Sequence, residues 1–317
     1  MGSCQIQHII TYKAEGYIGV AGERLGPPMA GAEDEMSKVW FVTGANSGIG
    51  AGVAKAASQA GHQVVATGRN MEKLRAAFAG DEGPNLALAQ LDVTDAEQAA
   101  PAIAQALSRF GRIDVLVNNA GNSYLGNFEE LANADIEEQM NTNFFGVVNV
   151  MRAALPVMRG QRSGHIINIS SVAGAVGLKH CSAYSASKFA VEGLSMAVAA
   201  EIEPFGIQVT IVEPGLFRTN LIDPTNARFA ENTIEDYAAE GSTRETWAAY
   251  DGTQQGDPAK LGEAIVKIAA LNRPLKLYVA GSDAVAVIAP AVEERLKTIR
   301  DNEAFSGSTD GLAARLR

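Results

Sequence analysis

The chain has 317 residues, 47% of them hydrophobic and 20% charged, which is typical of a soluble protein with a full core. The formal net charge of −10 and the lack of a dense Lys/Arg run argue against nucleic acid or an anionic membrane surface as a partner. The sequence has neither an apolar run long enough to span a bilayer nor a signal-peptide pattern at its start. We therefore expect a cytoplasmic protein that does not bind membranes.

Cysteine and histidine are too sparse for a disulfide framework or a zinc site. The cysteines are Cys4 and Cys181, and the four histidines are scattered along the chain. Two cysteines cannot build a network of disulfides, and a Cys/His zinc site needs clustered ligands. We expect no metal at the site.

The first 35 residues differ from the rest. Their apolar stretches are short, and Gly26-Pro27-Pro28 with the acidic run Glu33-Asp34-Glu35 breaks any regular element. This pattern predicts a poorly ordered N-terminal extension over 1–35, followed by a single domain over 36–300.

A glycine-rich turn follows the first predicted strand. The apolar run 39–43 leads at once into 44–50 and then into helix-forming residues from 51 to 60. In this order, glycines let a diphosphate approach the backbone, and the helix N-terminus offers free N–H groups. The candidate cofactor residues here are Gly44, Asn46, Ser47, Gly48, Ile49 and Gly50. The alternative is a tight strand–helix turn that binds no ligand.

The second predicted strand, 63–67, ends in Gly68-Arg69-Asn70. A dinucleotide-binding fold that prefers NAD usually has an acidic residue near this position, to hold the ribose 2′-hydroxyl. An acid would repel a 2′-phosphate, whereas a guanidinium pairs with it. Arg69 therefore favours NADP (NADPH) over NAD, and Asn70 is a second candidate contact. In the alternative interpretation, Arg69 is a solvated residue that caps the next helix.

Two further strands, 86–91 and 113–117, end in polar residues. Ligands collect at such carboxyl ends in open α/β sheets. Asp92 follows the first strand, although a helix cap explains it nearly as well. Asn118-Asn119-Ala120-Gly121 follows the second. The Asn side chains there could brace neighbouring strands, and we expect at least one of the two to do so.

The stretch 133–158 has a helical pattern and carries Asn141 and Asn143 at its middle. Asn is unfavourable inside a helix. The pair therefore indicates a polar role or a solvated face.

The fifth strand, 166–169, leads through Ser170-Ser171 to a helix that carries Tyr184 and Lys188 and ends near residue 203. Residues four apart share one face of a helix. A free tyrosine has a pKa of about 10, and a nearby positive charge lowers that pKa toward the range where an acid/base works best. Taken alone, the pair is better explained by a helix face with a solvated lysine.

The remaining pattern is a sixth strand at 208–212, a polar and Ala-rich stretch at 216–257, a helix at 261–270, a seventh strand at 276–279 and a helix at 284–300. We interpret 216–257 as a substrate lid and 301–317 as a loosely ordered tail. Strand–helix alternation predicts an α/β fold. This would be a Rossmann-type, doubly wound parallel sheet of about seven strands with helices on both faces, in three αβα layers.

Four motifs resemble the short-chain dehydrogenase/reductase family, in its shorter single-domain branch. They are Thr43 to Gly50, Asn118-Asn119-Ala120-Gly121, Ser171 thirteen residues before Tyr184-x-x-x-Lys188, and Pro214-Gly215 followed by Thr219. The resemblance covers about 36–300. Within the family, the chain looks most similar to 17β-hydroxysteroid dehydrogenase-like and retinol dehydrogenase-like members, although this group name does not indicate a steroid substrate.

The resemblance implies roles for the matching residues. Tyr184 would give a proton to a carbonyl oxygen in reduction, or take it from an alcohol in oxidation, and Ser171 would hydrogen-bond that oxygen. Lys188 would lower the pKa of Tyr184 and hold the nicotinamide ribose, and Asn143 would hold a water in the proton relay. The implied cofactor contacts, besides Tyr184 and Lys188, are Asp92, Val93, Asn118, Ala120, Gly121, Pro214, Gly215, Phe217 and Thr219.

We therefore predict an NADP-dependent oxidoreductase that moves a hydride between nicotinamide and a ketone, an aldehyde or a secondary alcohol. One alternative is NAD-dependent alcohol or hydroxysteroid oxidation at the same site. Another is a non-catalytic NADP-sensing protein, which would not need the intact catalytic set. A sugar-nucleotide epimerase or dehydratase fits less well, because its glycines follow a Thr-Gly-x-x-Gly-x-x-Gly spacing.

The substrate pocket is the least determined part. Phe217, Trp247 and other aromatics of 216–250 suggest an apolar pocket and a hydrophobic substrate. Residues that could lie near its mouth are Tyr124, Leu178, His180 and Cys181. The family often pairs helices between subunits, and the Ala-rich run Phe189 to Ala200 would permit close packing. We expect a homodimer or tetramer.

Overall fold

The structure is a computed structural model that describes residues 37–81, 83–223, 227–238 and 241–311. These residues belong to one compact unit, 37–317. The N-terminal extension predicted over 1–35 lies outside the described residues.

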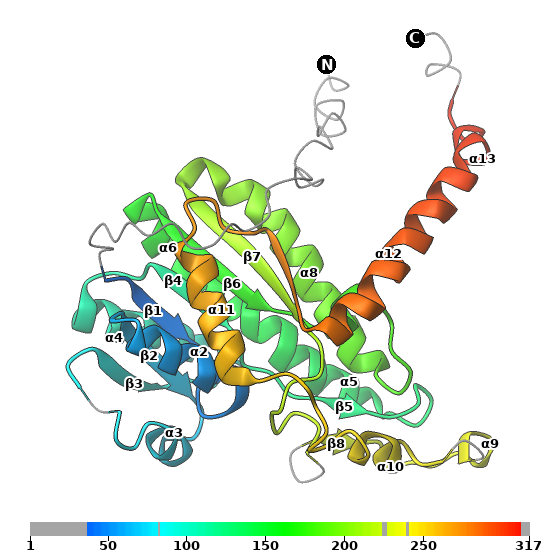
Figure 1. Ribbon diagram of the computed structural model, residues 1–317, viewed down its shortest axis with the longest axis horizontal. Coiled ribbons are helices and arrows are strands. Elements are labelled where there is room, and N and C mark those ends of the chain that lie inside the picture. The colour runs from blue at the N-terminus through cyan, green and yellow to red at the C-terminus, as the bar shows by residue number, and fades with distance from the viewer. Residues whose placement is uncertain (1–36, 82, 224–226, 239–240, 312–317) are drawn as a thin grey trace. The chain divides into compact units, whose positions relative to one another are not determined.

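Within the described ranges, a sheet of seven parallel strands forms the centre, in the order β3-β2-β1-β4-β6-β7-β9 (Figure 1). The strands are β1 Val39–Val42, β2 Gln63–Gly68, β3 Leu86–Gln90, β4 Val115–Asn118, β6 Gly164–Ile169, β7 Ile207–Pro214 and β9 Leu277–Ala280. The inner strands are almost wholly buried, as expected for a parallel sheet covered on both faces.

Helices cover both faces of this sheet. Those that follow or flank its strands are α2 Gly48–Gln59, α3 Met71–Ala77, α4 Ala96–Phe110, α5 Asn133–Met140, α6 Gly146–Gln161, α8 Ser182–Ile202, α11 Pro258–Ala270 and α12 Ser282–Asp301. One core cluster joins α2 and α11 to the sheet, and a second joins α4, α6 and α8 to its opposite face. The predicted doubly wound, three-layer fold is therefore confirmed.

The strand order places the site. Strands β1 and β4 are neighbours in the sheet, although β2 and β3 lie between them in the chain. At such a switch point the connections leave in opposite directions and open a crevice at the carboxyl ends of the strands. The glycine turn after β1 and the Asn run after β4 therefore meet at one edge of the sheet.

The lid and tail regions contain short elements. A small second sheet pairs β5 Tyr124–Leu125 with β8 Arg228–Phe229, and α9 Glu235–Ala238 and α10 Thr243–Ala248 follow β8. The predicted tail is helical at its start, because α12 runs to Asp301 and α13 occupies Glu303–Gly307. All residues of α13 are exposed.

Two glycines set the close crossing of α2 and α11. A Cβ on Gly262 would lie 2.4 Å from the carbonyl oxygen of Gly52, and a Cβ on Gly52 would lie 2.3 Å from the carbonyl oxygen of Pro258. Both obstacles are backbone atoms, so a larger residue must push the helices apart.

We expect Gly262→Ala to lower the free energy of unfolding by about 1–3 kcal/mol, measured by chemical denaturation. The matched control is Gly160→Ala in α6, where an added Cβ meets no atom within 4 Å. This control should be neutral or stabilise the protein by up to about 1 kcal/mol, because alanine is the better helix former. Equal effects of the two substitutions would contradict the close helix crossing.

Neither a bilayer-spanning helix nor a metal-binding cluster occurs in the described part of the chain. None of its helices combines the length and the apolar character needed to cross a membrane. No three His, Cys, Asp or Glu side chains gather there in an arrangement that could hold a metal ion.

Candidate active site

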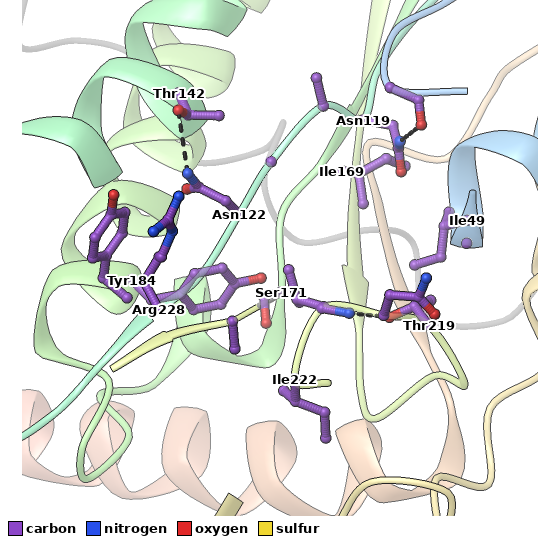
Figure 2. Close-up of a pocket in the computed structure, with 18 of the residues that line it drawn as sticks. Ile49, Asn119, Asn122, Thr142, Ile169, Ser171, Tyr184, Thr219, Ile222 and Arg228 are labelled. Atoms are coloured by element: carbon purple, nitrogen blue, oxygen red, sulfur yellow. Dashed lines mark hydrogen bonds between the residues drawn. The ribbon is translucent and has the colours of Figure 1, made fainter. Parts of the chain in front are cut away.

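A cavity of about 1140 Å³ opens at the carboxyl ends of the strands (Figure 2). Most of the predicted site residues line it: Gly44, Asn46, Ser47, Gly48, Ile49, Arg69, Asp92, Val93, Ala120, Gly121, Ser171, Tyr184, Lys188, Pro214, Gly215, Phe217 and Thr219. Four predicted residues lie outside this lining: Gly50, Asn70, Asn118 and Asn143.

The glycine turn between β1 and α2 forms one wall. Gly44 and Gly48 have φ values of +63° and +56°, a conformation that favours glycine. Ser47 is the N-cap of α2 but makes no side-chain cap hydrogen bond, and the first turn carries no acidic residue. The first N–H groups of α2 therefore lack a side-chain partner, and an anion at this wall would find both donors and a favourable helix dipole.

Gly50 serves packing rather than contact with the cavity. A Cβ there would lie 2.4 Å from Asn119 Nδ2 and 2.5 Å from the carbonyl oxygen of Gly44. The prediction of Gly50 as a direct cofactor residue is therefore corrected. It lets α2 approach the Asn run after β4.

Arg69 lies in the cavity wall where β2 ends, beside Gly68. Its side chain is exposed, and its carbonyl oxygen accepts a hydrogen bond of 3.3 Å from Gln90 Nε2. Asn70 instead caps α3, because its Oδ1 accepts from the backbone N of Lys73 at 2.9 Å. The predicted contact by Asn70 is thus corrected to a helix cap, a role for which Asn is well suited.

Of the two roles that the sequence left open for Asp92, the structure supports a place at the cavity and not the helix cap. Asp92 lines the cavity, and its Oδ1 accepts hydrogen bonds from the backbone N and the hydroxyl of Thr94, at 3.0 and 2.7 Å. Asp95 is the true N-cap of α4.

The two adjacent asparagines at the end of β4 have different roles. Asn118 is buried in the sheet, and its Nδ2 donates to Asn168 Oδ1 on β6 at 2.8 Å. Asn119 turns toward the glycine turn and donates to the carbonyl oxygens of Thr43 and Gly44, at 3.0 and 3.1 Å. Asn118 therefore braces strands and does not contact the cavity, and Asn119, which was not a predicted site residue, lines it.

The predicted long helix is interrupted where its asparagines lie. A π-helical turn, Asn141–Phe145, joins α5 to α6. Such turns occur frequently at functional sites. Asn143 is buried, and its amide bonds the backbone N of Asn122 at 3.0 Å, the carbonyl of Asn122 at 3.1 Å and the Ser187 hydroxyl at 3.2 Å. These contacts tie the π-helical turn to the loop after β4 and to α8, and Asn122 bonds Thr142 as well (Figure 2).

Ser171, Tyr184 and Lys188 come together at the centre of the cavity wall. A side-chain hydrogen bond joins Tyr184 to Ser171, whose Oγ also accepts from the backbone N of Ala173 at 3.1 Å. Lys188 Nζ donates to the carbonyl oxygen of Ile169 at 2.8 Å and lies 5.7 Å from the centre of the Tyr184 ring. Both side chains are buried.

Burial controls the protonation of these groups. It raises the pKa of Tyr184, and the hydrogen bond from Ser171 opposes the rise. It lowers the pKa of Lys188 to about 8, and the Glu192 carboxylate opposes that fall. The sequence predicted a lowered pKa for Tyr184. The structure reverses that direction, because the cost of burying a phenolate exceeds the stabilisation it receives.

The far end of the cavity is formed by the lid and by the small sheet. Its apolar wall includes Leu221, Ile222, Ala227 and Phe229, and Arg244 stacks over the Phe229 ring at 4.4 Å. Tyr124 lines this end as well, and its hydroxyl bonds the Glu138 carboxylate.

Three residues expected near the mouth have other roles. Leu178 and Cys181 pack in a small cluster with Tyr184 and Trp247, and burial raises the pKa of the Cys181 thiol to about 12. The ring of His180 hydrogen-bonds Asn127 Oδ1 at 2.9 Å. None of the three lines the cavity.

A family model described as short chain dehydrogenase matches residues 38–229. The chain belongs to the short-chain dehydrogenase family. The resemblance read from the four motifs is thereby confirmed. The match covers strands β1 to β8, the glycine turn and the helix with Tyr184 and Lys188, so these features belong to the family's common framework.

Similar short-chain dehydrogenases are known by sequence and by structure. The chain is 41% identical over 242 residues to the 3-ketodihydrosphingosine reductase of Bacteroides thetaiotaomicron, covering 75% of this chain and 85% of the relative. A crystal structure of a short-chain dehydrogenase from Streptomyces avermitilis matches with a TM-score of 0.78 and 39% identity, covering 87% of this chain and all of the other. A serine dehydrogenase complexed with NADP+ matches with a TM-score of 0.65 and 29% identity, covering 76% and 93%.

Short-chain dehydrogenases bind a nicotinamide cofactor, and this cavity fits one. The wall at α2 offers N–H groups without side-chain partners to a diphosphate. Gly121 lies close to Asn143, since an added Cβ would be only 3.1 Å from Asn143 Oδ1. The missing side chain therefore keeps this part of the wall open. Gly48 likewise keeps the turn close to Thr219, whose methyl group would lie 3.0 Å from an added Cβ. The turn after β1 and the loop after β7 thus lie against each other at the cavity wall.

Proposed function

We propose that this short-chain dehydrogenase is an NADPH-dependent reductase of hydrophobic ketones or aldehydes that also oxidises the corresponding alcohols. The hydrogen-bonded pair of Ser171 and Tyr184, with Lys188 buried beside it, carries this proposal. The Tyr184 phenol carries its proton at neutral pH, and its place beside Ser171 in the cavity wall lets it give that proton to a carbonyl oxygen.

In the proposed mechanism, the cofactor supplies a hydride to the carbonyl carbon. Tyr184 donates its hydroxyl proton to the carbonyl oxygen, while the Ser171 hydroxyl hydrogen-bonds the same oxygen and stabilises its developing charge. Lys188 is cationic below its pKa of about 8, and this charge stabilises the phenolate that proton transfer leaves behind. Ile169 fixes the direction of the ammonium group through its carbonyl oxygen.

The residue after β2 supports NADPH as the cofactor. Arg69 lies at the cavity wall where an NAD enzyme would need a carboxylate, and Gly68 precedes it. A guanidinium in this position makes charge-assisted hydrogen bonds to a 2′-phosphate.

The apolar far wall supports a hydrophobic substrate. Ile222, Ala227 and Phe229 offer no hydrogen-bonding side chains there, and the charged lining residues Arg228, Glu231 and Arg244 are exposed. The Bacteroides relative is named for the reduction of a keto compound. We propose a ketone with a substantial apolar part as the substrate class.

The run Phe189 to Ala200 of α8 supports the expected oligomer. Phe189 and Met196 are 41% and 40% exposed and lie seven residues apart, so they share a face of the helix. We propose that this face is covered by a second copy in a homodimer or tetramer.

Titration with cofactor, followed by thermal unfolding, tests the proposed function without a known substrate. A ligand at one hundred times its dissociation constant stabilises the folded protein by about 2.7 kcal/mol. We expect a larger rise of Tm with NADPH than with NADH, followed by NADPH oxidation with a panel of aliphatic and aromatic ketones. Failure of both cofactors to raise Tm would overturn the proposal.

A further inference from the structure

Two carboxyl groups, Glu192 and Glu213, lie together behind Lys188. Glu192 belongs to α8, and Glu213 is at the end of β7, only 2% exposed. Their side chains are hydrogen-bonded to each other. Ser170 Oγ donates to Glu192 Oε1 at 2.6 Å, while Glu213 Oε2 is buried and has no hydrogen-bond partner in the structure.

A hydrogen bond between two carboxyl groups requires that one of them be protonated. An ionised carboxylate can only accept, so one group must carry the donated proton. Two carboxylates that share a site cannot both ionise at ordinary pH, and one pKa of the pair is strongly raised. The pair therefore holds one proton and one negative charge.

The charge of this pair faces Lys188. Tyr184, Lys188 and Glu192 follow each other at intervals of four residues, so they share one face of α8. Each has a partner in the three consecutive residues at the end of β6. Tyr184 bonds Ser171, Lys188 bonds the carbonyl of Ile169, and Glu192 bonds Ser170.

The other elements around the pair contribute little charge. The end of β6 and α7 Val172–Ala175 contribute only the hydroxyls of Ser170 and Ser171. Strand β9 places Val279 beside Glu213, and α12 contributes Asp283, which bonds the backbone N of Leu216 at 2.7 Å. From α8 itself come Tyr184, Lys188 and, at its N-cap, the neutral thiol of Cys181. Lys188 is thus the cation that interacts electrostatically with the Glu192–Glu213 pair, through Glu192.

We propose that Glu192 and Glu213 form a proton-sharing acid pair whose single negative charge is the counter-ion of Lys188 and keeps that lysine cationic while Tyr184 gives up its proton. The inference rests on the proposed function, since Lys188 matters here through Tyr184. Glu192 touches neither the cavity nor the reacting atoms and is a positioning residue, as is Glu213. The pair also fixes Ser170, and hence the two residues on either side of it that hold Lys188 and Tyr184.

The electrostatic directions agree with this arrangement. Glu192 is the group that opposes the lowering of the Lys188 pKa by burial. Burial, followed by the charge of Glu192, raises the pKa of Glu213 to about 8. Burial also raises the pKa of Glu192, which Lys188 and the Ser170 hydroxyl oppose.

Titration of the Lys188 side chain by NMR tests the pair directly. The 13Cε signal of Lys188 is followed from pH 6 to 11 in the full chain without cofactor, and Lys188→Met identifies it. We expect Glu192→Gln to move the titration to lower pH by roughly 1 to 3, because Glu192 is the member of the pair whose charge acts on Lys188. In Glu213→Gln the amide donates to Glu192, which stays ionised, so the Lys188 titration should not move to lower pH.

These two isosteric variants separate a counter-ion from a merely structural role. Equal titration of Lys188 in the wild type and in Glu192→Gln would overturn the proposal, as would an equal downward shift in both variants. Failure of the protein to bind NADPH or reduce ketones would leave this titration unaffected, so the proposed function and the acid pair fail independently.

The pH dependence of stability gives a second test. The pKa of Glu213 rises from 4.5 to about 8 on folding, so its folded form binds a proton that the unfolded chain releases between these values. The resulting stability is present below pH 4.5 and is lost as pH rises through about 8. We expect the Tm of the wild type to fall more steeply over this range than that of Glu213→Gln. Parallel pH profiles would contradict the shared proton.

Discussion

Tyr184→Phe should reduce kcat for ketone reduction by about 10²- to 10⁴-fold, the usual contribution of a general acid. The substitution removes the hydroxyl that gives the proton and keeps the ring. The ring is what packs against Leu125, Ala173 and Cys181. The fold should therefore be unaffected, and the Kd for NADPH, measured by the change in protein fluorescence, should stay within a few-fold of the wild type.

Ser171→Ala is the matched comparison for this prediction. It removes the hydrogen bond that Tyr184 receives and the one proposed for the carbonyl oxygen, and it also removes the N-cap bond to Ala173. We expect a loss in kcat of about 10²- to 10³-fold. Because Ser171 and Tyr184 act on the same oxygen, the double variant should be little worse than Tyr184→Phe. A double variant whose loss is the product of the two single losses would contradict their joint action.

A substantial residual rate in Tyr184→Phe would exclude Tyr184 as the acid. The next candidate donor in the cavity would then be the Lys188 ammonium, which is buried and close to its pKa at neutral to mildly basic pH. The pH profile of the variant distinguishes the two cases. A profile whose rate falls above pH 8 would point to Lys188, and a flat profile would point to water.

The fold could be predicted because its strands have a clear sequence pattern. A buried parallel strand is a short apolar run, and each of those found here ends in glycine or polar residues that lead into the next helix. The position of the site followed from the same rule, since ligands bind at the carboxyl ends of the strands.

Which of Asn118 and Asn119 braces the strands and which lines the cavity could not be predicted from the sequence. Both are polar and both follow β4, and the resemblance to the family assigned the wrong one to the cavity. Side chains alternate along a strand, and Asn118 is still paired with Asn168 in the sheet. The register of β4 against β6 places Asn118 opposite Asn168. If that register had been known, the sequence would have predicted that Asn118 braces the two strands.

Properties that depend on tertiary packing were outside the reach of the sequence. The direction of the Tyr184 pKa depends on how completely the ring is buried, which spacing does not reveal. The π-helical turn at Asn141–Phe145 depends on the contacts of Asn143 with Asn122 and Ser187. The meeting of Glu192 with Glu213 depends on how α8 packs against β7, because the two residues are twenty-one positions apart.

Arg69→Ser should weaken NADPH binding by roughly 10- to 150-fold, which corresponds to about 1.5–3 kcal/mol for hydrogen bonds to a charged group. NADH binding should change by less than about twofold, because NADH lacks the 2′-phosphate that the guanidinium pairs with. The dissociation constants are measured by fluorescence titration at two salt concentrations. The loss for NADPH should be smaller at high salt, because Arg69 is exposed and its charge is screened.

Arg75→Ser is the control that separates a specific contact from a general loss of positive charge. Arg75 is also exposed and lies on α3, six residues further along the chain, but it does not line the cavity. The two variants change the net charge equally, so Arg75→Ser should leave the ratio of NADPH to NADH affinity unchanged. If Arg69→Ser weakened both cofactors equally, the arginine would support the adenosine half in general. The proposed preference for NADPH would then lose its structural basis, and oxidation of an alcohol with NAD would become the better interpretation of this cavity.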